Sequence, residues 1–298
     1  MALAALDRKK RSPEFSISDP GYFTLPGVAH RYRDWKKEGH GIVNMHKSIV
    51  ISCDTYYYGL ATELGIDAIH RHLAKFNFGS RTGIDIDGEL TGIAPSTDWK
   101  WQRFKQKWFT GDTVSVGIGQ GYLLATPLQL AVATATLAND GVPVHPRLLK
   151  SVQDSRTQEI RELQPAEDEA PVAKPEHLAF IRAAMVDVTR PGGTAARAGA
   201  NAGYAIAAKT GTAQVIAMKQ GEKYDEKRVK EAHRDHALFI AYAPADKPRL
   251  AMALLVENGG HGGSTAAPIA REVFDYYLLG KLPEKRQKLG EDEPEEHD

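Results

Sequence analysis

A short segment around residue 210 places a lysine, two hydroxyls and a glycine within a stretch that should be a buried strand. An apolar run precedes it and a β-branched run follows it, and this pattern favours a strand over 207–215. A cation and hydroxyls are costly to bury unless they bind something. Because glycine has no side chain, another backbone or a ligand can approach closely at that position. Lys209, Thr210, Gly211 and Thr212 are therefore candidate site residues.

A second candidate group, Ser52-Cys53-Asp54, falls at the junction between two predicted helices. The first helix is capped by Asn44 and runs to about residue 52, and the second ends before Gly65. A serine hydroxyl at such a junction can relay protons, and an acid two residues on can orient a neighbouring group. Taken alone, the structural interpretation is favoured, in which Ser52 ends one helix and Asp54 caps the next.

The elements that must position these groups are helices first, then strands, then a closing helix. Hydrophobic periodicity and capping residues predict helices over 67–76, 96–105, 126–138, 176–189 and 266–279. Two further strands, 236–242 and 249–257, follow the strand at 207–215, and a hairpin is expected around 147–163. Hairpin-linked strands with helices outside predict an antiparallel sheet flanked by helices, in an α+β domain.

The composition limits the classes of function. The 298 residues are 42% hydrophobic and 26% charged, which is typical of a folded globular chain. Lys+Arg and Asp+Glu both number 38, so no net charge draws the chain to nucleic acid. The aromatic and basic segment 99–108 is better explained by an amphipathic helix whose long side chains cover apolar surface. No apolar run approaches the ~20 residues of a membrane span.

Other segments are assigned by composition. Residues 12–43 are expected to be loop-rich, with turns and short extended pieces between them, and the charged residues 217–236 to form an excursion from the fold. The acidic tail at 281–298 is predicted to be disordered. The glycine-rich run at 117–121 lacks the lysine of a phosphate-binding loop, so close packing near the site is expected there. The single cysteine, Cys53, excludes an internal disulfide.

The chain resembles the penicillin-binding proteins and serine β-lactamases, whose second and third motifs are Ser-x-Asn or Ser-x-Asp and Lys-Thr/Ser-Gly. Here these motifs stand at 52–54 and 209–211. The segments that resemble class B penicillin-binding proteins are 23–27, 32–37, 111–113, 117–122 and 126–129. Those that narrow the resemblance to the cell-elongation transpeptidases, penicillin-binding protein 2, are 234–236, 239–244 and 257–260. The resemblance runs in order over about residues 17–280 and implies the penicillin-binding transpeptidase fold.

The first motif of that family, Ser-x-x-Lys, is missing from this sequence. No serine among the 298 residues is followed by lysine three positions later. In the family the nucleophilic serine starts a helix upstream of the second motif, and residues 1–6 resemble the end of that helix. The resemblance therefore implies an N-terminally truncated transpeptidase domain over 1–280. It would lack the helix that carries motif one, the membrane anchor and the N-terminal domain.

The resemblance implies one wall of a site for D,D-transpeptidation of peptidoglycan stem peptides that end in D-Ala-D-Ala. Ser52 would pass a proton toward the leaving D-alanine, and Asp54 would position that group or bind the substrate backbone. Lys209 would add positive potential that favours the deprotonated form of nearby hydroxyls. The substrate-binding residues that it implies are Thr210, Gly211 and Thr212. The two threonines would hold the terminal carboxylate, which β-lactam antibiotics mimic.

A third cluster, Asp19, Asp34, His40 and Cys53, could hold a metal ion. A thiolate, an imidazole and two carboxylates form an acceptable tetrahedral zinc set, although their spacing is not that of a recognised finger. The alternative is a small buried cysteine beside the site, with both aspartates as turn caps. Some members of the resembled family carry zinc on such a set, so the resemblance implies a structural zinc that ties 17–43 to the second motif. Transpeptidation itself requires no cofactor.

The resemblance also implies a setting and partners. Cross-linking would occur during cell elongation, at the periplasmic face of the bacterial inner membrane, with a glycan-polymerising partner and shape-determining proteins. Two alternatives stay open. A related β-lactamase or D,D-carboxypeptidase would need an intact Ser-x-x-Lys and a water-activating carboxylate. A catalytically inactive fragment or interaction module would keep the fold without being acylated, and the missing first motif favours this alternative for the chain as given.

Overall fold

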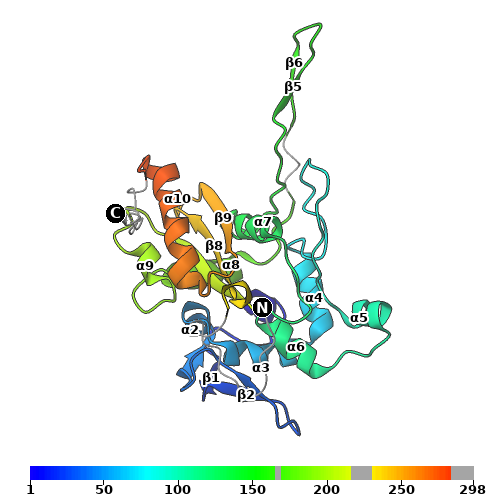
Figure 1. The fold of residues 1–298 in the computed structure, drawn as a ribbon, viewed down its shortest axis with the longest axis vertical. Helices are drawn as coiled ribbons and strands as arrows, with labels where there is room; N and C mark the ends of the chain where they lie inside the picture. Colours follow the sequence, from blue (N-terminus) through cyan, green and yellow to red (C-terminus); the bar gives the residue numbers. More distant parts are fainter. Residues whose placement is uncertain (165–168, 216–229, 283–298) are drawn as a thin grey trace, which may run out of the picture.

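The structure is a computed structural model that describes residues 1–164, 169–215 and 230–282 (Figure 1). Most of the excursion predicted at 217–236, and the tail from residue 283, lie outside the described residues, so those two predictions stay untested. One hydrophobic core unites the strands of a sheet with helices from both ends of the chain. Its largest fully buried apolar side chains include Tyr56, Phe239, Tyr242 and Phe274.

A three-stranded antiparallel sheet carries the lysine-threonine-glycine segment. Strand β7 (Ala207–Ala213) pairs with β8 (His236–Ala243), which in turn pairs with β9 (Leu250–Val256). The predicted antiparallel sheet is therefore confirmed, and β7 ends two residues earlier than the sequence pattern predicts.

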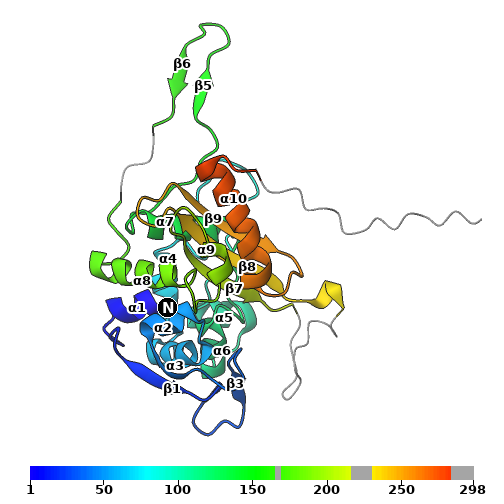
Figure 2. The same cartoon turned by 90° about the vertical axis from the view of Figure 1, so that its left-hand side faces the viewer.

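Helices flank this sheet, as predicted. Helix α8 (Pro175–Asp187) packs against β7 and α7 (Pro127–Ala138) packs against β9. The closing helix α10 (Ala267–Leu279) packs on β8 and on the short α9 (Ala196–Gly199), and Figure 2 shows it running beside the sheet. Helix α7 begins as predicted, with the Thr126 hydroxyl as its cap and a proline at its first position.

The remaining helices form a second, helical part of the fold around the second motif (Figure 1). They are α1 (Ala2–Asp7), α2 (Met45–Val50), α3 (Asp54–Leu64), α4 (Ile66–Ala74), α5 (Thr97–Phe104) and α6 (Thr110–Gly117). Helix α1 is buried from Ala2 to Leu6 and packs against α8, so it belongs to the core. Of the helices in the described ranges, none is long and apolar enough to cross a membrane.

The sequence analysis did not predict α6. Gly111, Gly117 and the β-branched residues between them disfavour a helix in isolation. Packing against α3 overrides that preference, because a side chain at Gly117 would approach the Ala61 Cβ to 2.6 Å. The Phe109 N–H donates to the Asp112 carboxylate at 3.0 Å and stabilises the start of the helix.

In the loop-rich region 12–43 the expected short extended pieces pair as two small antiparallel ladders. Strand β1 (Ser16–Asp19) pairs with β4 (Gly41–Asn44), and β2 (Tyr22–Thr24) pairs with β3 (Arg31–Arg33). The strands are three or four residues long, which is near the lower limit for a periodic pattern to be recognised in a sequence. They bring the chain back to Asn44, which caps α2 as predicted.

Three short elements complete the fold. The hairpin predicted around 147–163 consists of β5 (Ser151–Gln153) and β6 (Ile160–Glu162), and it projects away from the rest of the chain in both views (Figures 1 and 2). A 3₁₀ turn spans Glu231–His233 before β8. A π-helical turn, Gly262–Ala266, leads into α10 and packs against β7 and β8.

The π-helical turn packs closely on β7 and β8, and this packing can be tested. A Cβ at Gly262 would lie 2.1 Å from the Leu238 carbonyl oxygen and 2.6 Å from that of Gly211. We expect Gly262→Ala to lower the free energy of unfolding by about 1–3 kcal/mol, because the turn must move away from the sheet. Chemical denaturation of the chain measures this, with Gly203→Ala as the control, since a Cβ there meets nothing within 4 Å. Equal unfolding midpoints for the two variants would contradict the expectation.

Candidate active site

Two segments that are distant in the sequence meet where β7 passes the junction between α2 and α3. Lys209 Nζ donates hydrogen bonds to Ser52 Oγ and, at 3.0 Å, to the Thr210 carbonyl oxygen. Ser52 Oγ also lies 3.5 Å from Thr210 Oγ1. The structure therefore brings together the cation and the two hydroxyls that were nominated from separate motifs.

Ser52 has an unusual backbone conformation, with a φ of +54°. For a residue other than glycine such a conformation costs about 1–2 kcal/mol and persists only where its surroundings enforce it. The Cys53 N–H donates to the Ser48 carbonyl at 3.0 Å and closes the end of α2. The N-cap of α3 is Cys53, so the interpretation of Asp54 as the cap is wrong. Asp54 is the first helical residue, and its carboxylate accepts the Trp35 N–H at 3.2 Å.

The charges at the site are tuned by burial. Burial and, to a smaller extent, the nearby Asp34 carboxylate raise the pKa of Asp54 to about 7, although the Trp35 N–H and Lys209 act in the opposite direction. Burial lowers the pKa of Lys209 to about 8, and the charge of Asp54 opposes this shift. Near pH 7 Lys209 therefore remains largely protonated. Its positive charge favours the deprotonated form of the hydroxyl that it contacts.

Thr194 also joins the site, although it was not among the site residues predicted from the sequence. Its Oγ1 lies 2.9 Å from Thr210 Oγ1, so the hydroxyls of Ser52, Thr210 and Thr194 form a chain. The Thr194 N–H donates to the Val50 carbonyl at 3.2 Å, which fixes the residue to the end of α2. A Cβ at Gly263 would lie 2.3 Å from the Thr194 carbonyl oxygen, so the π-helical turn packs directly on it. Because these contacts come from three separate elements, no local sequence pattern predicts them.

The far end of β7 is held by the glycine-rich segment. Gln120 Nε2 donates to the Thr212 carbonyl oxygen at 2.8 Å. The close packing expected here is found at two of the three glycines, since a Cβ would lie 2.6 Å from the Ala61 Cβ at Gly117 and 3.1 Å from the Ser115 Cβ at Gly121, whereas a Cβ at Gly119 would meet nothing within 4 Å. Segment 117–121 therefore positions the edge of β7 beyond Gly211. Gln120 itself was not predicted from the sequence to contact this strand.

The four candidate metal ligands converge, with one ligand atom from each lying within 4.8 Å of all the others. His40 Nδ1 lies 2.8 Å from Asp19 Oδ2 and 3.5 Å from Asp34 Oδ1, and Cys53 Sγ lies 3.4 Å from Asp19 Oδ2. Burial raises the pKa of the Cys53 thiol, and the two carboxylates raise it further, although a backbone hydrogen bond from Tyr56 acts in the opposite direction. A bound cation would offset this accumulation of negative charge, and one nitrogen, one sulfur and two oxygens suit zinc.

The same carboxylates also serve as turn caps, as the alternative interpretation predicts. Asp19 Oδ1 accepts the Gly21 N–H at 2.8 Å. Asp34 accepts the Lys36 N–H and the Thr55 N–H, each at 3.0 Å. These bonds do not exclude a metal, because each carboxylate oxygen offers two lone pairs. His40 Nε2 is buried without a hydrogen-bond partner in the described part of the chain.

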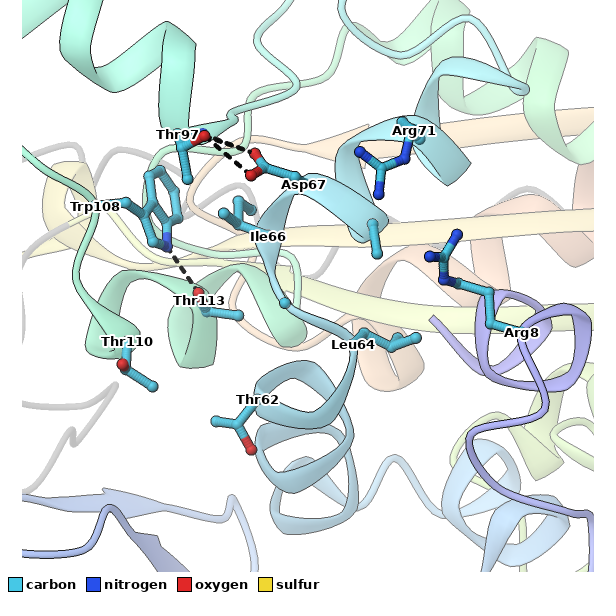
Figure 3. Close-up of a pocket in the computed structure, with 12 residues that line it drawn as sticks. Arg8, Thr62, Leu64, Ile66, Asp67, Arg71, Thr97, Trp108, Thr110 and Thr113 are labelled. Atoms are coloured by element: carbon cyan, nitrogen blue, oxygen red, sulfur yellow. Dashed lines mark hydrogen bonds between the residues drawn. The ribbon is translucent and has the colours of Figure 1, made fainter.

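A separate cavity of about 460 Å³ lies among α1, α3, α4 and α6 (Figure 3). Figure 3 shows Arg8 and Arg71 at one side of it and Trp108 at the other, with Leu64 between them. None of its lining residues is a candidate site residue. The second and third motifs therefore meet outside this cavity, and the candidate site is defined by the hydrogen bonds between them.

Comparisons with known proteins show what this chain is similar to. The profile of the family described as penicillin binding protein transpeptidase domain matches residues 1–275. The peptidoglycan D,D-transpeptidase MrdA of Acinetobacter baumannii is 48% identical over 270 residues, which are 89% of this chain and 39% of that relative. The chain spans 39% to 44% of the length of the first curated relatives that it matches.

Solved structures show the same similarity. The crystal structure of Pseudomonas aeruginosa PBP2 in complex with WCK 5153 superposes with a TM-score of 0.80 and 40% identity, over 95% of this chain and 58% of that one. Helicobacter pylori PBP2, solved in complex with MreC, gives a TM-score of 0.77 and 32% identity, over 93% of this chain and 48% of that one. The matched family, the relatives and the antiparallel sheet with its flanking helices lead to one conclusion. The chain belongs to the penicillin-binding protein transpeptidase domain family.

Proposed function

We propose that this chain forms part of the active site of a peptidoglycan D,D-transpeptidase that cross-links stem peptides ending in D-Ala-D-Ala during cell elongation. The contact of Lys209 Nζ with Ser52 Oγ carries the proposal, because it joins the second and third motifs at one point. In this reaction a serine attacks the carbonyl between the two D-alanines and releases the terminal D-alanine. An amine from a second stem then attacks the acyl-enzyme and forms the cross-link.

The arrangement supports a distinct role for each group. The Ser52 hydroxyl, between Lys209 and the Thr210 hydroxyl, would relay a proton toward the departing D-alanine amine. Lys209 would supply positive potential, and Asp54 would position the relay or bind the substrate backbone. The hydroxyls of Thr210 and Thr212 would hold the terminal carboxylate. The Thr212 N–H would act as one oxyanion donor, a contribution that is typically worth about 10²–10³ in rate.

We further propose that the acylated serine and its base lysine lie outside these 298 residues, which contain no Ser-x-x-Lys. The transpeptidase domain would then extend over residues 1–280 and continue into residues that the given sequence does not include. The similarity to relatives more than twice as long as the aligned region supports this proposal. Without a nucleophile, the chain alone would bind stem peptides or β-lactams but would not become acylated by them.

Labelling with a fluorescent penicillin tests both proposals. The 298-residue chain should acquire no covalent label. We define an extended chain in which a Ser-x-x-Lys helix segment typical of the family is joined ahead of Met1, and we expect this chain to be labelled. Its label should vanish when the added serine is replaced by alanine. Label on the unextended chain that depends on one of its own serines would contradict the position of the nucleophile, and an unlabelled, folded extended chain would contradict the function.

One alternative function has a specific observation in its favour. The absence of Ser-x-x-Lys favours a catalytically inactive interaction module for the chain as given. A D,D-carboxypeptidase or β-lactamase, in contrast, would transfer the acyl group to water. Release of the penicillin label from the extended chain within minutes would favour those hydrolytic enzymes, whereas a stable label favours a transpeptidase.

The partners and the location of the whole protein are also proposals. The structure of Helicobacter pylori PBP2 was solved with MreC, so a shape-determining protein of that kind is a candidate partner here. A glycan-polymerising enzyme is a second candidate, since cross-linking needs nascent strands. The site would face the periplasm at the bacterial inner membrane, where peptidoglycan stems and β-lactam antibiotics are available.

We propose that Asp19, Asp34, His40 and Cys53 bind a structural zinc ion. The convergence of four donor atoms of suitable chemistry supports this proposal. Zinc would supply only a cross-link, because the proposed acyl transfer needs no cofactor. It would hold the ends of β1, β3 and β4 on the residue that precedes Asp54, and so connect the two ladders to the junction that carries Ser52.

A further inference from the structure

Trp35 is 61% exposed, yet it makes three hydrogen bonds to the junction that carries Ser52. Its indole Nε1 lies 2.9 Å from the Ser52 carbonyl oxygen and 3.1 Å from the Ile51 carbonyl oxygen. Its backbone N–H donates to the Asp54 carboxylate at 3.2 Å. Trp35 therefore contacts the residues on both sides of Ser52 while leaving the Ser52 hydroxyl to Lys209.

The two carbonyls that share the indole N–H flank the backbone torsions of Ser52. A peptide unit is planar, so fixing a carbonyl fixes the orientation of its whole peptide plane. The Ile51 carbonyl belongs to the plane before Ser52 and the Ser52 carbonyl to the plane after it. A shared hydrogen bond to both therefore restrains φ and ψ of Ser52 together. Such a restraint is needed there, because φ is +54° and this conformation is costly for serine.

Trp35 is itself held in place despite its exposure. The preceding residue, Asp34, accepts backbone N–H groups from Lys36 and from Thr55 at the start of α3. The Trp35 indole also packs against the His40 ring, with 5.3 Å between the ring centroids. The Asp34 contacts thus hold the backbone next to Trp35, and the His40 ring packs against the indole.

We propose that Trp35 is a positioning residue for Ser52, whose indole N–H holds the left-handed backbone that directs the Ser52 hydroxyl toward Lys209 and Thr210. The proposal rests on the proposed transpeptidase function, in which that hydroxyl relays a proton. Its physical consequence is specific. Loss of the N–H should let the serine relax toward an ordinary backbone conformation, and Oγ should leave the space between the cation and the Thr210 hydroxyl.

The test uses acylation of the extended chain by a fluorescent penicillin, with the acylation rate separated from the initial dissociation constant. Trp35→Phe should lower the acylation rate about 10–100-fold and leave the dissociation constant within about twofold, since misplacing a catalytic group by ~1 Å can cost about 10² in rate. The control is Trp101→Phe, because Trp101 is 56% exposed and makes no indole hydrogen bond within the described residues. That variant should match the unsubstituted chain.

A double-mutant cycle separates positioning from general destabilisation. In the Ser52→Ala background, Trp35→Phe should have no further effect on the acylation rate, because the hydroxyl that Trp35 positions is already absent. A further loss equal to that in the Ser52 background would overturn the proposal, as would a Trp35→Phe variant that acylates at the original rate. If Trp35→Phe fails to fold, the benzothienyl analogue of tryptophan retains the ring shape and removes only the N–H.

A second measurement does not depend on catalysis. The indole N–H of Trp35 in the 298-residue chain should exchange with solvent slowly in NMR spectra, whereas that of the similarly exposed Trp101 should exchange fast. Fast exchange at Trp35 would show that its indole N–H is not held by the two carbonyls, and this would overturn the proposal. If the extended chain is not acylated at all, the proposed function fails, and the exchange measurement still decides whether Trp35 holds the junction.

Discussion

Lys209→Ala in the extended chain is expected to lower the rate of acylation by about 10²–10⁴, the range typical for loss of a proton-transfer or charge-stabilising group. Lys209 Nζ donates to the Ser52 hydroxyl and to the Thr210 carbonyl oxygen, so its removal leaves the chain of hydroxyls without an adjacent positive charge. The rate of covalent labelling by a fluorescent penicillin measures the effect. Lys247→Ala is the matched control, because Lys247 is exposed in the turn between β8 and β9.

The pH profile of acylation gives the Lys209 prediction a second readout. Burial lowers the pKa of Lys209 to about 8, so its charge is present below that pH and is lost as the pH rises through it. If the charge assists the reaction, the rate should fall above about pH 8 in the unsubstituted chain. The alanine variant should lack this decline. A variant that keeps both the rate and the alkaline decline would show that another group supplies the charge.

Much of the fold was predictable because its elements carry strong local signals. The strand β7 stands between apolar and β-branched runs, and α7 has a threonine cap followed by proline. Helix α6 was missed because its glycines and β-branched residues disfavour a helix, and its stability comes from packing on α3. The strands in 12–43 were predicted only as short extended pieces, without bounds or pairing, because strands of three or four residues leave almost no periodic pattern.

The candidate site was predictable only in part. Lys209 and Ser52 are 157 residues apart, and the residues of 52–54 taken alone favoured a structural interpretation. The resemblance to a family, and not spacing, joined the two motifs. Thr194 and Trp35 act through backbone carbonyls and hydroxyls that meet only after folding, so their residue types carry no signal. The metal cluster was visible as a donor set, but its convergence depends on the pairing of the short strands in 12–43, which was not predicted.

If the proposed zinc ion is bound, its removal should destabilise the chain more than any surface substitution. Bound zinc should be present at about one ion per chain, and at free zinc about 1,000-fold above the dissociation constant it would contribute about 4 kcal/mol to the free energy of unfolding. A chelator should remove that contribution and lower the unfolding temperature. Elemental analysis and thermal unfolding with and without chelator measure the two effects.

Cys53→Ala decides between the metal site and a cysteine that is merely buried. If zinc binds, this variant should lose the metal and become insensitive to chelator, because the thiolate is one of four donors. If no metal binds, the variant removes a small buried thiol, and the chelator changes neither chain. His46→Ala is the matched control, since its imidazole pairs with Asp187 at 2.9 Å, apart from the cluster. It should keep the zinc content unchanged, and equal metal loss in both variants would indicate non-specific binding.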